Sequence, residues 1–426
     1  MVTYTLFGFC MKHLYIYLLF CLLSCVTVSQ VVYENMTYSP LIKTITLHKG
    51  VSSLDEPVIS LNTSETLYLE FDELIETTRR YEYTLIHCNS DWTQSNLTYD
   101  QYIEGFETQP IENFENSFNT LQRYVHYSQV IPSEDMKLTK SGNYIIKVFP
   151  EGKPDNVVFT KRMYVVEDKS DVELDVLSST LAPLLSTHQE VNVRVKGKNG
   201  SFFSNPDEYM KVVVIQNHND LATHQLKFRT MVGDKVDYSY DESNQFEARN
   251  EFRYFDFTSL RRKSQYVAGF DFVDNQNQVY LRDERLRNRL PYSYDKDLNG
   301  EFYIRNEYDD NYSITSDYAW VHFTYPVDLN LEGVYYVVGQ MNDWRAGAQS
   351  QMRYENGKYH LALYLKQGYY NYQIVFRHNN ENKLSTAQTE GNFSQTNNKY
   401  AVLVYYHNFA DDYDEIVGYQ SIEYNR

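Results

Sequence analysis

The sequence predicts an all-β protein built from tandem immunoglobulin-like antiparallel β-sandwiches. Apolar and polar residues alternate with a period of two along most of the chain, and long stretches with the 3.6-residue period of a helix are nearly absent. The chain has 41 Tyr and 23 Phe but only 10 Pro, which favours half-buried sheet surfaces. Short strands separated by turn signals favour sandwiches over βαβ units, which need about 10 to 15 helical residues between strands.

Strands are expected wherever this alternation persists. The clearest runs, in chain order, are LYLEFD (67–72), NYIIKVF (143–149), VNVRV (191–195), YYVVG (335–339), YHLALYL (359–365), YNYQIVF (370–376) and YAVLVYY (400–406). Only the polar stretch after Trp92 is expected to hold a short helix.

The N-terminus predicts a signal peptide at residues 1–29. Lys12 precedes an apolar run at 14–25, LYIYLLFCLLSC, and the small residue Ser29 follows. The run is shorter than the about 20 apolar residues that a membrane-spanning helix needs. We therefore expect export and cleavage after Ser29.

Two alternatives stay open for this leader. The segment LLSC matches a lipobox, which predicts a lipoprotein anchored at Cys25, and Met11 is a second candidate for the start of the chain. Cys10, Cys21 and Cys25 all lie in the leader, so a chain cleaved after residue 29 keeps only Cys88. No intramolecular disulfide is then available, and the domains must be stabilised by burial alone.

The length of 426 residues predicts several domains. We expect a first domain at 30–168, because a strand ends at Val166 and the charged segment EDKSD follows. A second domain is expected at 169–327, since Pro326 cannot donate to a sheet ladder. The remaining residues 328–426 have the size of one immunoglobulin-like sandwich. Without low-complexity linkers, the domains are expected to pack as a rigid rod.

The charge balance excludes nucleic acid as a partner. The full chain has 39 Lys and Arg against 57 Asp and Glu, and Lys12 is the only formally charged residue before position 30. The mature chain thus keeps 38 basic and 57 acidic residues, a net charge of −19, whereas duplex binding needs a basic face. One local exception is LRDERLRNRL (281–290), interpreted as a solvated strand or turn with its own counter-charges Asp283 and Glu284; the alternative is a contact patch for an acidic surface.

The segment HCNSDW (87–92) combines residue types that occur in catalytic and metal sites. Adjacent residues of a strand point to opposite faces, so His87 and Cys88 are not expected to form a nucleophile and base pair. The chain offers no second paired ligand group for zinc. We expect Asp91 to lie in a turn that ends the strand, because short polar side chains bond their own backbone there. We expect Trp92 to anchor the following segment on the sheet.

No other motif predicts catalysis, a metal or a cofactor. The segment DKDLNGEFYI (295–304) matches the start of a calcium loop, but Asn306 stands where the pattern needs a bidentate Glu. Its Asn-Gly pair followed by alternating residues favours a hairpin turn instead. Nucleotide-binding, serine hydrolase and metalloprotease motifs are absent from the sequence. We therefore predict a protein that is not an enzyme.

The C-terminal segment resembles the glycogen-binding carbohydrate modules with an immunoglobulin-like fold. The resemblance lies in GQMNDW (339–344), a G-x-x-N-x-W turn, and in LKQGYYNY (365–372). It implies that Trp344 corresponds to a tryptophan that stacks on sugar. The lysine expected after the second motif is Gln373 here, and HNNENKL (378–384) lacks the second stacking aromatic. Glycan binding through Trp344 is thus the alternative function.

A set of motifs along the chain resembles the plug proteins of type IX secretion, a Bacteroidetes family formerly defined as a domain of unknown function. The motifs are YEYTLIHCNSDWTQSNL (81–97), YIEGF (102–106), ENSFNTLQRYVHY (115–127), SGNYIIKVF (141–149), SDYAWVHF (316–323) and TEGNFSQTNNKYAVLVYY (389–406). The resemblance implies a periplasmic, non-enzymatic subunit without cofactors, monomeric within its complex. It implies that this subunit associates with the outer membrane by binding the giant β-barrel translocon of that system and occludes the periplasmic opening when no cargo passes. It assigns no residues to the translocon interface.

Overall fold

The computed structural model describes residues 33–50, 52–201, 203–326, 332–381 and 383–425. The signal peptide expected at 1–29, with the alternatives at Met11 and Cys25, lies outside these described residues. Strands β1 to β30 make up nearly all of the regular structure. The prediction of an all-β protein is confirmed.

The helices in the described part of the chain are single turns. They are α2 (Tyr99–Tyr102), α3 (Pro206–Tyr209), α4 (Tyr312–Thr315) and the 3-10 turns η1 (Glu242–Asn244) and η2 (Gln340–Asn342). Helix α2 lies in the polar stretch after Trp92, as predicted, and the Gln101 side chain accepts a hydrogen bond from the Thr98 backbone N–H at 2.7 Å. Within the described ranges, no helix is long and apolar enough to cross a membrane.

The first sandwich is formed by two sheets that share one core. One sheet contains, in spatial order, β1 (Met36–Thr37), β12 (Phe159–Val166), β11 (Gly142–Pro150), β5 (Tyr81–Cys88) and β7 (Gln109–Ile111), with β3 (Val58–Ser60) parallel to β12. The other contains β2 (Ile42–Lys49), β4 (Leu67–Glu73), β9 (Val125–Ile131) and β8 (Asn113–Asn116), while β6 (Ile103–Gly105) pairs with β10 (Met136–Leu138). Alternate residues of β4 enter the core at Leu67, Leu69 and Phe71, which explains the period of two in LYLEFD.

The second sandwich combines strands from the middle and the end of the chain. Its first sheet contains β13 (Ser170–Ser178), β14 (His188–Gly197), β18 (Lys235–Tyr238) and β17 (Thr230–Val232), with β19 (Gln245–Glu247) also paired to β14. Its second sheet contains β16 (Thr223–Leu226), β15 (Met210–Gln216), β29 (Asn398–Asn408) and β30 (Tyr413–Tyr424). Val191, Val193 and Val195 of β14 share the core with Val402 and Val404 of β29.

The third sandwich has an aromatic core. One sheet contains β20 (Arg253–Asp256), β28 (Gly368–His378) and β23 (Phe302–Ile304), with β25 (Gly333–Val338) also paired to β28. The other contains β21 (Val267–Val273), β22 (Gln276–Leu281), β24 (Tyr318–Tyr325), β27 (Lys358–Lys366) and β26 (Arg353–Glu355), with β22 parallel to β24. The Tyr370 ring stacks on Phe302 and Phe255, with ring centroids 5.1 and 5.3 Å away.

Strand pairing differs from the domain division expected from the sequence. Strand β29, which follows the boundary expected at residue 327, pairs with β15 of the second sandwich from Met210–Tyr406 to Gln216–Tyr400. Strands β20 and β23, which precede it, pair with β28. The second and third sandwiches are therefore interleaved in sequence. Alternation identifies a strand but not its distant partner. No local pattern in the sequence therefore indicates that strands of the second and third sandwiches alternate along the chain.

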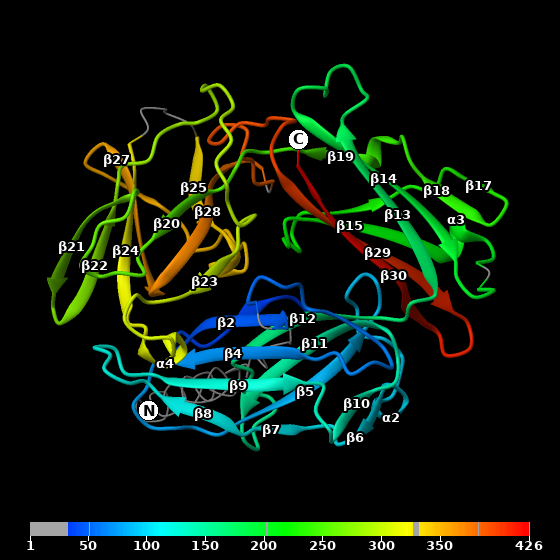
Figure 1. The fold of residues 1–426 in the computed structure, drawn as a ribbon, viewed down its shortest axis with the longest axis horizontal. Helices are drawn as coiled ribbons and strands as arrows, with labels where there is room; N and C mark the ends of the chain where they lie inside the picture. Colours follow the sequence, from blue (N-terminus) through cyan, green and yellow to red (C-terminus); the bar gives the residue numbers. More distant parts are fainter. Residues whose placement is uncertain (1–32, 51, 202, 327–331, 382, 426) are drawn as a thin grey trace, which may run out of the picture.

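The three sandwiches lie at the corners of a triangle instead of in the row that a rod requires (Figure 1). The first sandwich, in blue and cyan, contacts both of the others. Tyr164 and Val166 of β12 pack in one apolar cluster with Leu403 and Tyr405 of β29 and Ile416 of β30. This cluster joins the first sandwich to the second.

Candidate functional site

The HCNSDW stretch is structural. His87 lies fully buried at the end of β5; its Nε2 donates to the Ser141 carbonyl at 3.1 Å, and its Nδ1 accepts from the Ser95 hydroxyl at 2.9 Å. Burial lowers the pKa of His87 to about 4, so the ring is neutral at neutral pH. Burial also raises the pKa of the Cys88 thiol to about 12, which leaves it in the unreactive protonated form.

The following residues contact another sandwich. Ser90 donates from its backbone N–H and its hydroxyl to Asp414, at 3.2 and 2.5 Å, and Lys211 pairs with the same carboxylate at 3.0 Å. The Trp92 ring packs edge-on against Tyr164 and lies 4.0 Å from the guanidinium carbon of Arg162. Trp92 therefore anchors the segment on the sheet, as predicted, next to the second sandwich.

Trp344 does not present a sugar-stacking face. Only 5% of it is exposed, and its ring packs edge-on against Phe252 with ring centroids 5.6 Å apart. Gly300 lies so close that a Cβ atom at that position would sit 2.0 Å from the Trp344 ring. A stacking platform needs an open aromatic face, and here the neighbours cover it.

The segment 295–304 forms a turn, with Asn299 and Gly300 at positive φ. It is not a hairpin, because β23 pairs with β28 and not with a preceding strand. The Asp297 carboxylate accepts hydrogen bonds from the backbone N–H groups of Asn299, at 2.8 Å, and Phe252. Across the described ranges, no group of three or more His, Cys, Asp or Glu is arranged to hold a metal ion.

Three charged residues of the arginine-rich segment 281–290 form contacts within the protein. Glu284 forms an ion pair with Arg253 in the third sandwich, and Asp283 pairs with Lys358 at 2.6 Å. Arg287 donates to the Glu251 carbonyl at 2.7 Å. The counter-charges predicted for this segment therefore bind residues outside it.

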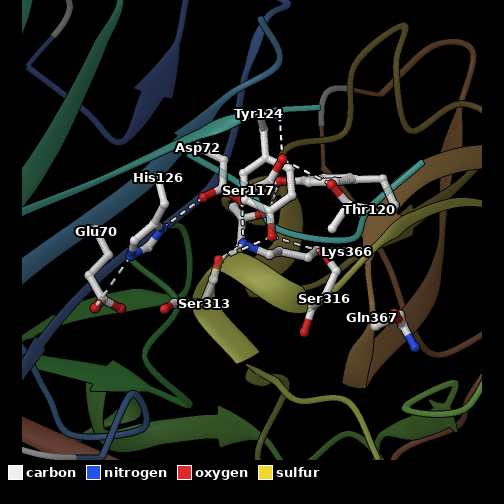
Figure 2. Close-up of polar contacts among 12 residues, drawn as sticks. Glu70, Asp72, Ser117, Thr120, Tyr124, His126, Ser313, Ser316, Lys366 and Gln367 are labelled. Carbon is white, nitrogen blue, oxygen red and sulfur yellow. Dashed lines mark hydrogen bonds and ion pairs between the residues drawn. The ribbon is translucent and has the colours of Figure 1, made fainter. Parts of the chain in front are cut away.

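A buried polar network lies between the first and third sandwiches, and we call it the interdomain clasp (Figure 2). At its centre is Asp72 of β4, which is fully buried. Its Oδ2 accepts from the Lys366 ammonium of β27 at 2.6 Å and from the Tyr318 hydroxyl of β24 at 2.7 Å. Its Oδ1 accepts from His126 Nδ1 of β9 at 2.8 Å. Two of the three donors therefore come from the third sandwich.

Lys366 is held on three sides. Its ammonium also donates to the Ser313 carbonyl of α4 at 2.5 Å and lies 4.2 Å from the centre of the Tyr124 ring. Burial raises the pKa of the Asp72 carboxyl, but Lys366 and His126 outweigh this effect and hold that pKa below its ordinary value. Asp72 is therefore a carboxylate, and its ion pair with Lys366 opposes the burial that lowers the pKa of that ammonium.

His126 carries a second positive charge in the clasp. Burial alone disfavours its protonation, but contacts with Asp72 and, at 3.9 Å, with Glu70 raise the pKa of His126 to about 9. Burial raises the pKa of the Glu70 carboxyl, but its contacts with His126 and His48 outweigh this effect and lower that pKa. His126 and Lys366 thus face the carboxylates of Asp72 and Glu70.

A loop of the first sandwich completes the clasp. The backbone N–H groups of Leu121 and Gln122 donate to the Asp317 carboxylate at 2.8 and 3.2 Å. The Tyr124 hydroxyl donates to the Ser316 carbonyl at 2.9 Å, and the Phe118 N–H donates to Ile314 O at 2.9 Å. These bonds fix residues 117–124 on helix α4 and the start of β24.

The clasp has the chemistry of a structural contact. Every charged group in it has a fixed partner, and Asp72 and Lys366 are fully buried. Charge-assisted hydrogen bonds of this kind fix orientation strongly. What the arrangement can do is hold the third sandwich against the first in one geometry.

Sequence reasoning did not single out these residues, although it quoted their segments. Alternation places Asp72 and His126 opposite the core face of β4 and β9, which indicates exposure to solvent. The third sandwich covers that face instead. A signal was available in ENSFNTLQRYVHY and SDYAWVHF, two of the motifs that carry the family resemblance, because they meet here at Tyr124 and Tyr318.

These features define a class of protein: a multi-domain β-sandwich protein with a buried polar network that joins two of its own domains. A family profile described as "Type 9 secretion system plug protein 1st domain" matches residues 42–167, the region of the first sandwich. A crystal structure of a hypothetical protein from Parabacteroides merdae ATCC 43184 is 31% identical, with a TM-score of 0.89, and the match covers 93% of this chain and all of that one. A search of curated proteins finds no match. This chain belongs to the type 9 secretion system plug protein family.

Proposed function

We propose that this protein is the periplasmic plug subunit that binds the giant outer-membrane β-barrel translocon of type IX secretion and occludes its periplasmic opening when no cargo passes. Family membership supports a role in type IX secretion. Occlusion of the opening requires in addition a protein of fixed shape. A wide barrel opening leaks unless a body of fixed shape fills it.

The observation that carries the proposal is the way the three sandwiches are joined into one body. The clasp fixes the first sandwich to the third, and the cluster around Leu403, with the Ser90–Asp414–Lys211 contacts, fixes it to the second. At the junction of all three, His218 of the second sandwich pairs with Glu56 of the first and Glu301 of the third, each at 2.6 Å. Charge-assisted contacts of this kind favour one arrangement of the three sandwiches.

The test is recovery of the partner from the native envelope. An affinity-tagged chain is purified from detergent-solubilised envelopes, and co-purifying proteins are identified by mass spectrometry. We expect one very large outer-membrane β-barrel protein in stoichiometric amount. Its absence from the purified complex contradicts the proposal.

A permeability assay tests occlusion separately from binding. Deletion of the gene should admit a dye that the intact outer membrane excludes, and additional removal of the barrel should restore exclusion. Re-expression of the Lys358→Met variant in the deletion strain should restore exclusion of the dye, because Lys358 forms only a half-exposed ion pair with Asp283. A leak that persists without the barrel shows that the plug acts elsewhere.

A further inference from the structure

A cavity of about 560 Å³ lies between the first and third sandwiches, beside the clasp. Strands β1, β2 and β12 contribute the wall from the first sandwich, and η2, residues 345–350, β27 and β28 contribute the facing wall. The volume falls within the roughly 300–1,000 Å³ of small-molecule sites, which combine an apolar lining with a few polar groups. Both kinds of lining occur here.

The apolar lining consists of side chains that the protein covers only in part. Met341, Leu363 and Leu365 pack against the aromatic core of the third sandwich, and Ile45 packs against the core of the first. All four keep some exposed surface, as does Met36 of β1. A hydrocarbon group in the cavity would remove this apolar surface from water.

The charged side chains of the lining are mainly basic. They comprise Lys43, Lys161, Arg345 and Arg377 against one carboxylate, Asp343. Lys161 pairs with Asp343 at 2.5 Å, and Arg345 pairs with a residue outside the lining, Glu34. Arg377 donates to the Tyr336 hydroxyl but forms no ion pair with the residues that the structure describes. The lining thus has positive charge in excess, in a chain whose net charge is −18.

Lys43 is a cation of this lining without a counter-charge in the described part of the chain. It stands opposite Asp72 in the pairing of β2 with β4, but the Asp72 carboxylate is already bonded within the clasp. No hydrogen bond or ion pair joins the Lys43 ammonium to another described residue, and the ammonium retains accessible surface. Burial lowers the pKa of Lys43, because it disfavours the charged form and no carboxylate offsets this effect. An anion in the cavity would supply the missing counter-charge.

We infer that this cavity binds a single-chain amphiphile, a linear hydrocarbon chain that ends in a carboxylate or phosphate group. The acidic group pairs with Lys43, and the hydrocarbon chain packs on Met341, Leu363 and Leu365. Binding at this cavity is independent of the proposed plugging function, because the cavity is formed by this chain alone.

Isothermal titration calorimetry with residues 30–426 tests this binding. The probes are decanoate and decyl phosphate below their critical micelle concentrations, with 1-decanol, butyrate and inorganic phosphate for comparison. We expect at least one acidic amphiphile to bind about tenfold more tightly than 1-decanol, because only the acidic group pairs with Lys43. It should also bind at least about a hundredfold more tightly than the matching short anion, because each buried methylene group adds hydrophobic stabilisation. Absence of binding by both acidic amphiphiles overturns the inference, as does equal binding of 1-decanol or of the short anion.

The Lys43→Met variant tests the role of the charge. It should bind the acidic amphiphile no more tightly than 1-decanol. The control is Lys49→Met, which makes the same charge change on the same strand outside the cavity, where Lys49 pairs with Glu65 at 2.7 Å. A preference for the acidic amphiphile that survives Lys43→Met contradicts the assignment.

The same variant gives a readout without ligand. Because no described residue bonds the Lys43 ammonium, Lys43→Met should not lower the melting temperature. A fall of several degrees would show that Lys43 already has a partner within the protein, and the inference then fails.

The Met341→Gln variant tests the apolar part of the site. It keeps the length of the side chain but places a polar group against the hydrocarbon chain, so it should weaken binding of the acidic amphiphile about tenfold. The control is Met231→Gln, since Met231 is a partly exposed methionine of the second sandwich outside the cavity. Undiminished binding by Met341→Gln contradicts the assignment, as does equal weakening by Met231→Gln.

Discussion

Substitution of Lys366 by Met removes the central charge of the clasp and keeps the length of the side chain. The variant loses the contacts with Asp72, the Ser313 carbonyl and the Tyr124 ring. Breaking a buried ion pair by removing one partner costs about 3–5 kcal/mol. Asp72 retains its bonds to His126 and Tyr318, so we expect the low end of this range, about 3 kcal/mol.

Differential scanning calorimetry of the purified chain measures this effect. A loss of about 3 kcal/mol should lower the transition that contains the first and third sandwiches by roughly 10 °C, at about 2–4 °C per kcal/mol for units of this size. Limited proteolysis should also cut residues 117–124 sooner, because their bonds to helix α4 and Asp317 depend on the docked third sandwich. Lys358→Met, on the same strand but half exposed, should change stability by less than about 1 kcal/mol.

A double-mutant cycle with Asp72→Asn separates the ion pair from general damage. If the two side chains act as a pair, the effects of Lys366→Met and Asp72→Asn should fall short of additivity by about 1–3 kcal/mol. Effects that add within about 0.5 kcal/mol would refute the reasoning, and so would a Lys366→Met variant as stable as Lys358→Met.

Four further predictions concern His126, His87, the Cys88 thiol and the end of the chain. The pKa of His126 rises from 6.5 to about 9 on folding, so the stability it contributes is complete below pH 6.5 and is lost as the pH rises through 9; His126→Gln should flatten the unfolding free energy over that window. The pKa of His87 falls from 6.5 to about 4, so stability should decline as the pH drops through this window, and a His87→Gln variant that keeps the same slope there would contradict this reasoning. Cys88 should resist iodoacetamide at pH 8 in the folded protein and react fully in denaturant, as followed by mass spectrometry. A chain ending at Asn397 lacks β29 and β30 and should lose the second sandwich, seen as a missing calorimetric transition, whereas loss of a separate terminal domain would leave that transition in place.

The fold could be predicted from the sequence where the information is local. Alternation located the strands, the polar stretch after Trp92 located α2, and strand geometry showed that His87 and Cys88 form no catalytic pair. Pairing could not be predicted, because β15 meets β29 across more than 180 residues of sequence and no local pattern encodes that meeting.

The interdomain clasp could not be predicted from the sequence for a related reason. A polar residue at an outward strand position usually faces water, and Asp72 and His126 occupy such positions. Only the docking of another sandwich shows that they are buried. Trp344 illustrates the converse: the turn at GQMNDW forms, with Asp343 at positive φ, but the burial of its ring depends on Phe252 and Gly300, which are distant in sequence.

The two interfaces of the first sandwich differ in their most buried part: the contact with the second sandwich has an apolar cluster around Leu403 with polar contacts beside it, whereas the contact with the third has the clasp. The apolar cluster with the second sandwich tolerates small shifts, because hydrophobic contact has little directionality. The clasp does not, since a displacement of the third sandwich leaves Asp72 or Lys366 buried without its partner. Exchange of a buried ion pair for apolar residues often leaves stability unchanged or higher, so strength alone does not explain the clasp. Its specific contribution is orientation. A subunit that fills an opening of fixed outline needs its domains held at one angle, and a buried charge network provides that constraint.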